Sequence, residues 1–223
     1  MNQPDAALVV FDLDGTLTRH DSFLPFLVGF LLRHPLRWPR VLRLPFAVLA
    51  FKLRLRSNTW LKIRFLRAIL GGLRKDQITP WVIEFTDRLI ARGIPAQAFE
   101  QLAKHQQDSD FLLLATASPD LYVHRIAEHL GFNAVICTEL DWGPDGDSLS
   151  GLMDGNCYGE EKLRRIQTWM QPQSFPGIQT AYSDHISDLP LLTAATHGVA
   201  VNPSKALALI SPSHNLQIQH WTK

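Results

Sequence analysis

Apolar and polar positions form blocks along the chain that predict strands and helices. The first apolar block, residues 8–11, ends abruptly in a polar stretch at 12–18, which predicts a buried strand followed by a turn. From residue 95 onward, the pattern predicts strands at 111–116, 135–137, 178–182 and 199–201, and a last edge strand at 216–219. Helices are expected at 96–107, 119–130, 160–170 and 188–195. This alternation predicts an α/β fold with a parallel sheet and helices on both faces.

Residues 19–88 break this alternation because their pattern is helical throughout. Helices are expected at 23–33, at 59–70 and from Thr79-Pro80 to Arg92, with prolines at 35, 39 and 45 between the first two. We therefore expect an α/β core made of residues 1–18 and 89–223, and an inserted all-helical domain of residues 19–88, called the basic insert below. A glycine-rich stretch at 142–159 predicts a small hairpin. No window reaches the roughly 18 uncharged apolar residues that a membrane-spanning helix needs.

Composition places the chain among globular proteins and narrows its setting. Of 223 residues, 46% are hydrophobic and 19% are charged, which suffices for a sizeable core. Two cysteines form neither a disulfide framework nor a metal-ligand cluster, and residues 1–5 lack the basic and apolar pattern of a signal peptide. A cytoplasmic location is therefore expected.

Charge is strongly segregated, although the net charge is only +1. Between Arg19 and Lys75 there are 13 Lys and Arg residues against one acid, Asp21. This balance admits a solvated basic surface, steering of an anionic substrate, or contact with an anionic membrane at its inner face. Nucleic acid is a weaker candidate because none of the usual binding motifs is present. The sequence leaves the first three open.

Polar groups with related chemistry follow predicted strands or begin predicted helices in four places. They are Asp12 and Asp14, the run Thr116-Ala117-Ser118, Lys162, and the pair Asp184 and Asp188. Because the carboxyl ends of parallel strands meet at one edge of a sheet, these groups are expected to lie together. Asp12 and Asp14 are two residues apart, so strand geometry would let them converge on one cation or phosphate. Such a set suits metal-assisted phosphoryl transfer.

These four stretches resemble the motifs of the haloacid dehalogenase superfamily, and the early helical insert is similar to that of its phosphoserine phosphatase-like branch. The resemblance covers the chain from Leu8 to about Pro203. It implies a three-layer Rossmann-like core, a helical cap formed by the basic insert, and a Mg²⁺-dependent phosphomonoesterase. The cap would recognise the leaving group of a phosphorylated small-molecule or lipid substrate.

The resemblance also implies a role for each matching residue. Asp12 would be the nucleophile that forms an aspartyl-phosphate, and Asp14 the general acid and base. Mg²⁺ would bind Asp12, the backbone carbonyl of Asp14 and Asp184, with Asp188 acting through a metal-bound water. Phosphate oxygens and the reacting groups around them would be contacted by Leu13, Thr116, Ala117, Ser118 and Lys162. Asp21 would contact a substrate amine, or would simply cap the following helix.

Several alternatives concern the substrate and the class of protein. Ala117-Ser118 replaces the paired glycines of phosphoserine phosphatases, which argues against an amino acid substrate. The basic insert is similar to that of a bacterial phosphatidylglycerophosphate phosphatase, which favours a lipid substrate. A non-catalytic phospholigand-binding protein would not require Asp14, and a dehalogenase would require neither the second aspartate nor Mg²⁺. His185 is interpreted as a solvated turn residue and Cys157 as packing. Oligomeric state is left open.

Overall fold

A six-stranded parallel sheet forms the centre of the molecule. The computed structural model describes residues 6–143 and 148–221. The sheet contains β1 (Leu8–Phe11), β2 (Phe111–Pro119), β3 (Ala134–Thr138), β6 (Ile178–Ser183), β7 (Ala195–Val201) and β8 (Gln217–Gln219). Their spatial order is β3-β2-β1-β6-β7-β8, so β1 lies between β2 and β6 with both partners parallel to it. The predicted α/β fold is confirmed.

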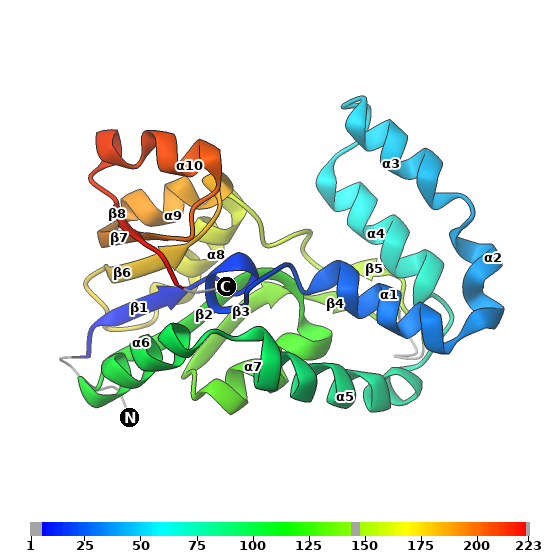
Figure 1. Cartoon of the computed structure of the whole chain (residues 1–223), viewed down its shortest axis with the longest axis horizontal. Coiled ribbons are helices and arrows are strands. Elements are labelled where there is room, and N and C mark those ends of the chain that lie inside the picture. Colours follow the sequence, from blue (N-terminus) through cyan, green and yellow to red (C-terminus); the bar gives the residue numbers. More distant parts are fainter. Residues whose placement is uncertain (1–5, 144–147, 222–223) are drawn as a thin grey trace.

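Helices cover both faces of this sheet (Figure 1). One face carries α5 (Lys75–Gly93), α6 (Ala96–Gln107) and α7 (Asp120–Leu130), and the other carries α8 (Glu160–Met170), α9 (Leu189–Ala194) and α10 (Lys205–Ile210). Alternation along β1 divides the core accordingly: Val9 and Phe11 pack in the first cluster, and Leu8 and Val10 in the second. The four strand residues are at most 1% exposed, which explains their continuous apolar pattern.

The basic insert folds into helices that stand beside the sheet (Figure 1). They are α1 (Phe23–Arg33), a 3₁₀ turn at Pro35–Arg37, α2 (Trp38–Val41), α3 (Leu44–Lys52) and α4 (Asn58–Ile69). Ser57 caps α4 as its sequence predicts, because its side chain accepts the Trp60 N–H. Aromatic packing of Phe26 against Phe85 and Tyr122 joins α1 to α5 and α7. Within the described residues, none of these helices is long and apolar enough to cross a membrane.

The structure differs from the expected elements at α5 and α10 and adds detail to the expected hairpin. Helix α5 begins at Lys75 instead of Thr79, because Gln77 and Arg74 form a capping box that starts the helix earlier and places Pro80 inside it. The expected domain boundary at residue 88 falls within this helix. Helix α10 was not predicted, since its six residues are too short for a periodic signal. The expected hairpin contains β4 (Leu140–Asp141) and β5 (Gly151–Leu152), while residues 144–147 lie outside the described part.

Candidate active site

A cavity of about 730 Å³ lies between the carboxyl ends of the central strands and the basic insert. Its polar floor comes from the core and includes the residues after β1, the end of β2, the start of α8 and the turn after β6. Its opposite wall comes from the insert and is largely apolar, with Phe23, Leu24, Val48, Phe51, Leu61 and Phe65. The cavity therefore joins a charged floor to an apolar wall.

Lys162 connects two carboxylates on the floor of this cavity. Its Nζ lies 2.8 Å from Asp12 Oδ1 and 2.6 Å from Asp188 Oδ2, and all three side chains are buried. Burial alone would lower the pKa of Lys162, but the charges of Asp12 and Asp188 raise it above its usual value. Burial raises the pKa of Asp12; Lys162 opposes this shift, and the nearby charges of Asp188 and Asp184 add to it. The floor therefore concentrates negative charge around one buried cation.

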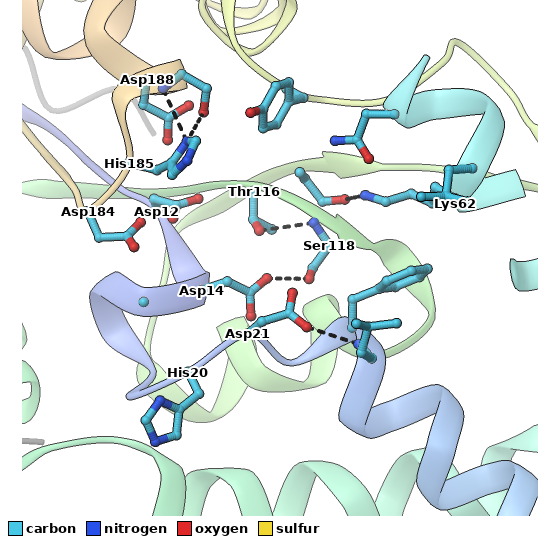
Figure 2. A pocket seen from close by; sticks show the side chains of 18 of the residues that line it. Asp12, Asp14, His20, Asp21, Lys62, Thr116, Ser118, Asp184, His185 and Asp188 are labelled. Carbon is cyan, nitrogen blue, oxygen red and sulfur yellow. Dashed lines mark hydrogen bonds between the residues drawn. The ribbon is translucent and has the colours of Figure 1, made fainter. Parts of the chain in front are cut away.

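Asp14 points away from this group toward the start of α1. Its Oδ1 accepts the Ser22 N–H at 2.7 Å. Its Oδ2 accepts the Ser118 hydroxyl at 2.6 Å (Figure 2). The Tyr122 hydroxyl lies 2.9 Å from Ser118 Oγ and 3.0 Å from Ser22 Oγ, which closes a buried network. Burial and the charge of Asp21 raise the pKa of Asp14. The shared face expected for Asp12 and Asp14 is not kept, because β1 ends at Phe11 and Asp14 lies in a turn.

Asp184 follows β6 and lies beside Asp12 (Figure 2). Gly15 faces it at φ +80°, and a Cβ at this position would lie 2.3 Å from Asp184 Oδ2, so the backbone after β1 approaches this carboxylate closely. Burial raises the pKa of Asp184 to about 7, and the charge of Asp188 contributes. The carboxylates and nearby backbone carbonyls are hard oxygen donors of the kind that Mg²⁺ prefers.

The donor set fits a Mg²⁺ ion held by few protein groups. Among residues 6–143 and 148–221, no three Asp, Glu, His or Cys side chains form a metal cluster by themselves. Mg²⁺ commonly uses one or two carboxylates and completes its shell with water and substrate phosphate. Asp188 Oδ1 is buried without a hydrogen-bond partner, while its Oδ2 accepts from Lys162 and Ser183. This oxygen therefore has no partner within the described part of the chain and could accept a hydrogen bond from a ligand or a water.

The stretch after β2 supplies backbone and hydroxyl groups to the cavity. Thr116 is buried, and its Oγ1 accepts the Ser118 N–H at 3.1 Å. Thr116, Ala117 and Ser118 all line the cavity. Leu13 differs, since its side chain is fully buried in the core and only its backbone could meet a ligand. The structure thus brings the predicted phosphate-binding run to the same cavity as Asp12.

Lys62 enters the cavity from the basic insert and was missed by sequence reasoning. It lies on α4 and is 8% exposed (Figure 2). Its Nζ donates to Ala117 O at 2.6 Å and to Asn156 Oδ1 at 2.7 Å. Burial lowers its pKa to about 8. The sequence held a signal for its burial, because Lys62 is spaced to lie on the same face of α4 as Leu66 and Ile69, and these two apolar residues are buried. Tyr122, in the first turn of α7, was also missed, although it lies four residues after Ser118.

The remaining candidates have simpler surroundings. Asp21 lines the cavity, and its Oδ2 accepts the Leu24 N–H at 3.0 Å, which is a capping contact for α1. His185 is exposed, and its Nδ1 accepts the Ser187 N–H at 3.2 Å. Cys157 is buried and free, and burial raises the pKa of its thiol to about 11. The surroundings of His185 and Cys157 are those of a turn residue and a packed residue.

Comparisons with known proteins cover most of the chain. The profile of the family described as haloacid dehalogenase-like hydrolase matches residues 9–193. Protein CicA of Caulobacter vibrioides is 33% identical over 189 residues, which cover 84% of this chain and 82% of that protein. A histidinol-phosphatase of Neisseria meningitidis is 25% identical over 217 residues, covering 90% of this chain and 92% of the relative.

Solved structures share the fold. A protein of unknown function from Bordetella pertussis superposes with a TM-score of 0.80 at 25% identity, covering 96% of this chain and 97% of that chain. A probable phosphoserine phosphatase from Vibrio cholerae gives a TM-score of 0.74 at 11% identity, covering 99% of this chain and 62% of that chain. At 11% identity, the likeness to the Vibrio cholerae protein concerns the fold alone.

Proposed function

The chain belongs to the haloacid dehalogenase-like hydrolase family, and from this premise we propose that it is a Mg²⁺-dependent phosphomonoesterase with Asp12 as nucleophile. Family membership confirms the resemblance expected from the four motifs. The observation that carries the proposal is the placement of Asp12, Lys162, Asp184 and Asp188 around one cavity, with Asp14 held on the side of the insert. The relative named histidinol-phosphatase supports phosphomonoester chemistry.

In the first half-reaction, a carboxylate oxygen of Asp12 attacks the phosphorus atom of the substrate. The bond from phosphorus to the ester oxygen breaks, and Asp14 gives its proton to the departing alkoxide. The raised pKa of Asp14 suits this acid role, since its burial favours the protonated form. The products are the free alcohol and an aspartyl-phosphate on Asp12.

In the second half-reaction, water attacks the phosphorus of the aspartyl-phosphate and Asp14 takes the water's proton. The bond from phosphorus to Asp12 breaks, so the Asp12 carboxylate is restored and inorganic phosphate leaves. Ser118 and Ser22 hold Asp14 in both steps, because each donates to one of its carboxylate oxygens. Atoms and protons balance over the cycle, with one water consumed.

Phosphate oxygens would be held by the Thr116 hydroxyl, by the backbone N–H groups of Leu13 and Ala117, and by Lys162. Ser118 contributes mainly by orienting Asp14. Mg²⁺, bound by Asp12, the Asp14 carbonyl and Asp184, would neutralise the crowded carboxylates and the phosphate dianion. Lys162 keeps Asp12 and Asp188 oriented toward the reacting group.

The basic insert, residues 19–88, would act as the cap over a core of residues 1–18 and 89–223. Its apolar wall and Lys62 face the cavity, so this part of the chain would recognise the leaving group. A small or lipid-linked organic phosphate fits such a wall, and a phosphatidylglycerophosphate-type lipid is one candidate. An amino acid phosphate is the alternative, with Asp21 contacting its amine, although Asp21 already caps α1.

Release of phosphate from nitrophenyl phosphate with Mg²⁺ tests the proposal. We expect Asp12→Asn to reduce the rate by on the order of 10⁴-fold or more, as for removal of a nucleophile. The matched control is Asp108→Asn, an exposed aspartate on the core, which should leave the rate unchanged. Equal rates above the uncatalysed background for Asp12→Asn and the native chain would refute the nucleophile assignment. Background rates for both proteins would favour a non-catalytic phospholigand-binding protein. A substrate panel with phosphate release as readout would then rank lipid, amino acid and sugar phosphates.

A further inference from the structure

A second hollow lies on the outside of the basic insert, between α3 and α4. This hollow has a volume of about 460 Å³ and adjoins another of about 540 Å³, and the two share Arg40, Arg43 and Arg67. Arg64 and Trp60 both line the first hollow, and the guanidinium carbon of Arg64 lies 5.1 Å from the centroid of the Trp60 ring. We call this feature the arginine groove and define it by Arg40, Arg43, Arg64 and Arg67. It contains no residue assigned above to the catalytic cavity.

The arginine groove carries an excess of positive charge, of which the Arg67 guanidinium interacts with the charge of Asp141. Residues 22–75 contain neither Asp nor Glu. In the described part of the chain, no ion pair joins any of the four arginines to an acid. Arg40 and Arg67 donate to the backbone carbonyls of Gly71 and Ser150, which orients them but leaves their charge in place. Guanidinium groups gathered in this way favour a phosphate or another anion.

An apolar stripe runs along α3 beside the arginine groove. Leu42, Phe46, Leu49 and Leu53 are 71%, 73%, 53% and 60% exposed. Phe46 and Leu49 are three residues apart and lie on one side of α3, while Leu42 and Leu53 lie in the turns just before and just after this helix. Phe46 also lines the groove, so the stripe and the arginines are continuous. Large apolar side chains gathered on an exposed face indicate an interaction surface.

The opposite side of α3 contributes to the catalytic cavity. Val48, Phe51 and Lys52 line that cavity, and they lie about half a helical turn from the apolar stripe. Figure 1 shows α2 and α3 on the side of the insert away from the sheet. A partner that covers the stripe would therefore lie next to the catalytic cavity without entering it.

We propose that the arginine groove and the apolar stripe together dock on an anionic phospholipid surface. The arginines bind headgroup phosphates, while Leu42, Phe46, Leu49 and Leu53 enter the boundary between headgroups and acyl chains. Basic residues combined with large apolar ones on one helical face are what interfacial binding requires. A nucleic acid would use the arginines but would leave the apolar stripe in water. Charge complementarity and the stripe together select the lipid surface, and this docking does not depend on the proposed catalysis.

Vesicle co-sedimentation of the full chain tests this proposal. We expect binding to vesicles of phosphatidylcholine mixed with phosphatidylglycerol, weak binding to phosphatidylcholine alone, and loss of binding as salt rises. The double variant Arg43→Ala/Arg64→Ala should bind these vesicles roughly 25-fold more weakly, because each arginine near an anionic surface raises the binding constant roughly fivefold. The control Lys104→Ala/Lys205→Ala removes the same charge from exposed positions on the core and should bind as the native chain does.

The stripe is tested separately by Phe46→Ser, with Leu209→Ser as its control. Leu209 is 82% exposed on α10, far from the insert in Figure 1, so its loss should leave vesicle binding unchanged. Phe46→Ser should weaken binding about tenfold, since a buried phenyl ring contributes on this scale. Circular dichroism and hydrolysis of nitrophenyl phosphate should match the native chain for all four variants.

Three outcomes would overturn the proposal. The first is an absence of vesicle binding by the native chain, and the second is equal loss of binding in the arginine variant and its lysine control. The third is tighter binding to single-stranded or duplex nucleic acid than to anionic vesicles at the same salt concentration. None of these outcomes would affect the assignment of Asp12, because the readout is binding and needs no turnover.

Discussion

Replacing Lys162 with methionine removes the ammonium group that lies between Asp12 and Asp188. The side chain is 2% exposed, and Nζ lies 2.8 Å and 2.6 Å from the two carboxylates. Breaking a buried ion pair by removing one partner costs about 3–5 kcal/mol, because the other charge stays buried and uncompensated. We expect a cost of this size in the free energy of unfolding, measured by urea titration without metal. Activity should fall about 10²–10³-fold, as when one donor to a developing negative charge is removed.

A double-mutant cycle tests whether the cost arises from the stranded charge. Asp188→Asn keeps the shape of its side chain and removes one of the two carboxylates that Lys162 contacts. If the cause is the uncompensated charge, Lys162→Met should cost about 1–3 kcal/mol less in the Asp188→Asn background than in the native chain. Equal costs in the two backgrounds would refute the reasoning and would point to a packing defect. Lys162→Arg serves as the charge-conserving comparison.

Three further predictions concern other parts of the site. Tyr122→Phe loses two hydrogen bonds near Asp14 and should cost about 1–3 kcal/mol of stability. It should also slow hydrolysis of alkyl phosphates more than of aryl phosphates, because an alkoxide leaving group depends most on protonation by Asp14. Equal slowing of the two substrate classes would contradict this prediction. Gly15→Ala should weaken activation by Mg²⁺ about tenfold or more in a metal titration, because its Cβ would collide with Asp184; unchanged activation would contradict the metal assignment. Lys62 has a pKa lowered to about 8, below its unfolded value, so the native chain should gain stability as pH rises through about 8 to 10. Lys62→Met should lack this gain of about 2–3 kcal/mol in urea unfolding, and a parallel pH dependence in the two proteins would refute it.

The sequence predicts where the site residues at the strand ends lie, because each strand end is marked by a change from apolar to polar residues. Asp12, Thr116 and Asp184 each follow an apolar run that becomes β1, β2 or β6, and the parallel arrangement brings these ends to one edge. Lys162 was predictable only as part of the set, because a single lysine on a helix is normally solvated. Its burial between two aspartates becomes visible in three dimensions.

Other features depend on tertiary contacts that the local sequence pattern alone does not decide. The sequence places Lys62 among Arg64 and Arg67 in one basic helix, yet Lys62 is buried while the two arginines are exposed. This difference arises because one face of α4, the face with Lys62, packs inward, while the arginines lie on its outer side. Likewise, strand geometry predicts a common direction for Asp12 and Asp14, but the turn after Phe11 sends Asp14 to Ser22 and Ser118.

The arginine groove shows the same dependence on packing. Alternating basic and apolar residues in the insert were compatible with a solvated surface, with substrate steering or with a membrane surface. The structure separates Val48 and Phe51, which line the catalytic cavity, from Phe46 and Leu49, which are exposed on the other side of α3. This separation allows one helix to serve a substrate and a surface at the same time.

The covalent step on Asp12 is the central claim, and chemical trapping tests it most directly. Native protein mixed with substrate and Mg²⁺ would be quenched in acid and treated with borohydride, which reduces an aspartyl-phosphate to homoserine. Peptide mass spectrometry should then find homoserine at position 12, and neither Asp12→Asn nor untreated protein should show it. Phosphate release without homoserine at this position, or with homoserine at another aspartate such as Asp14 or Asp184, would contradict the assignment.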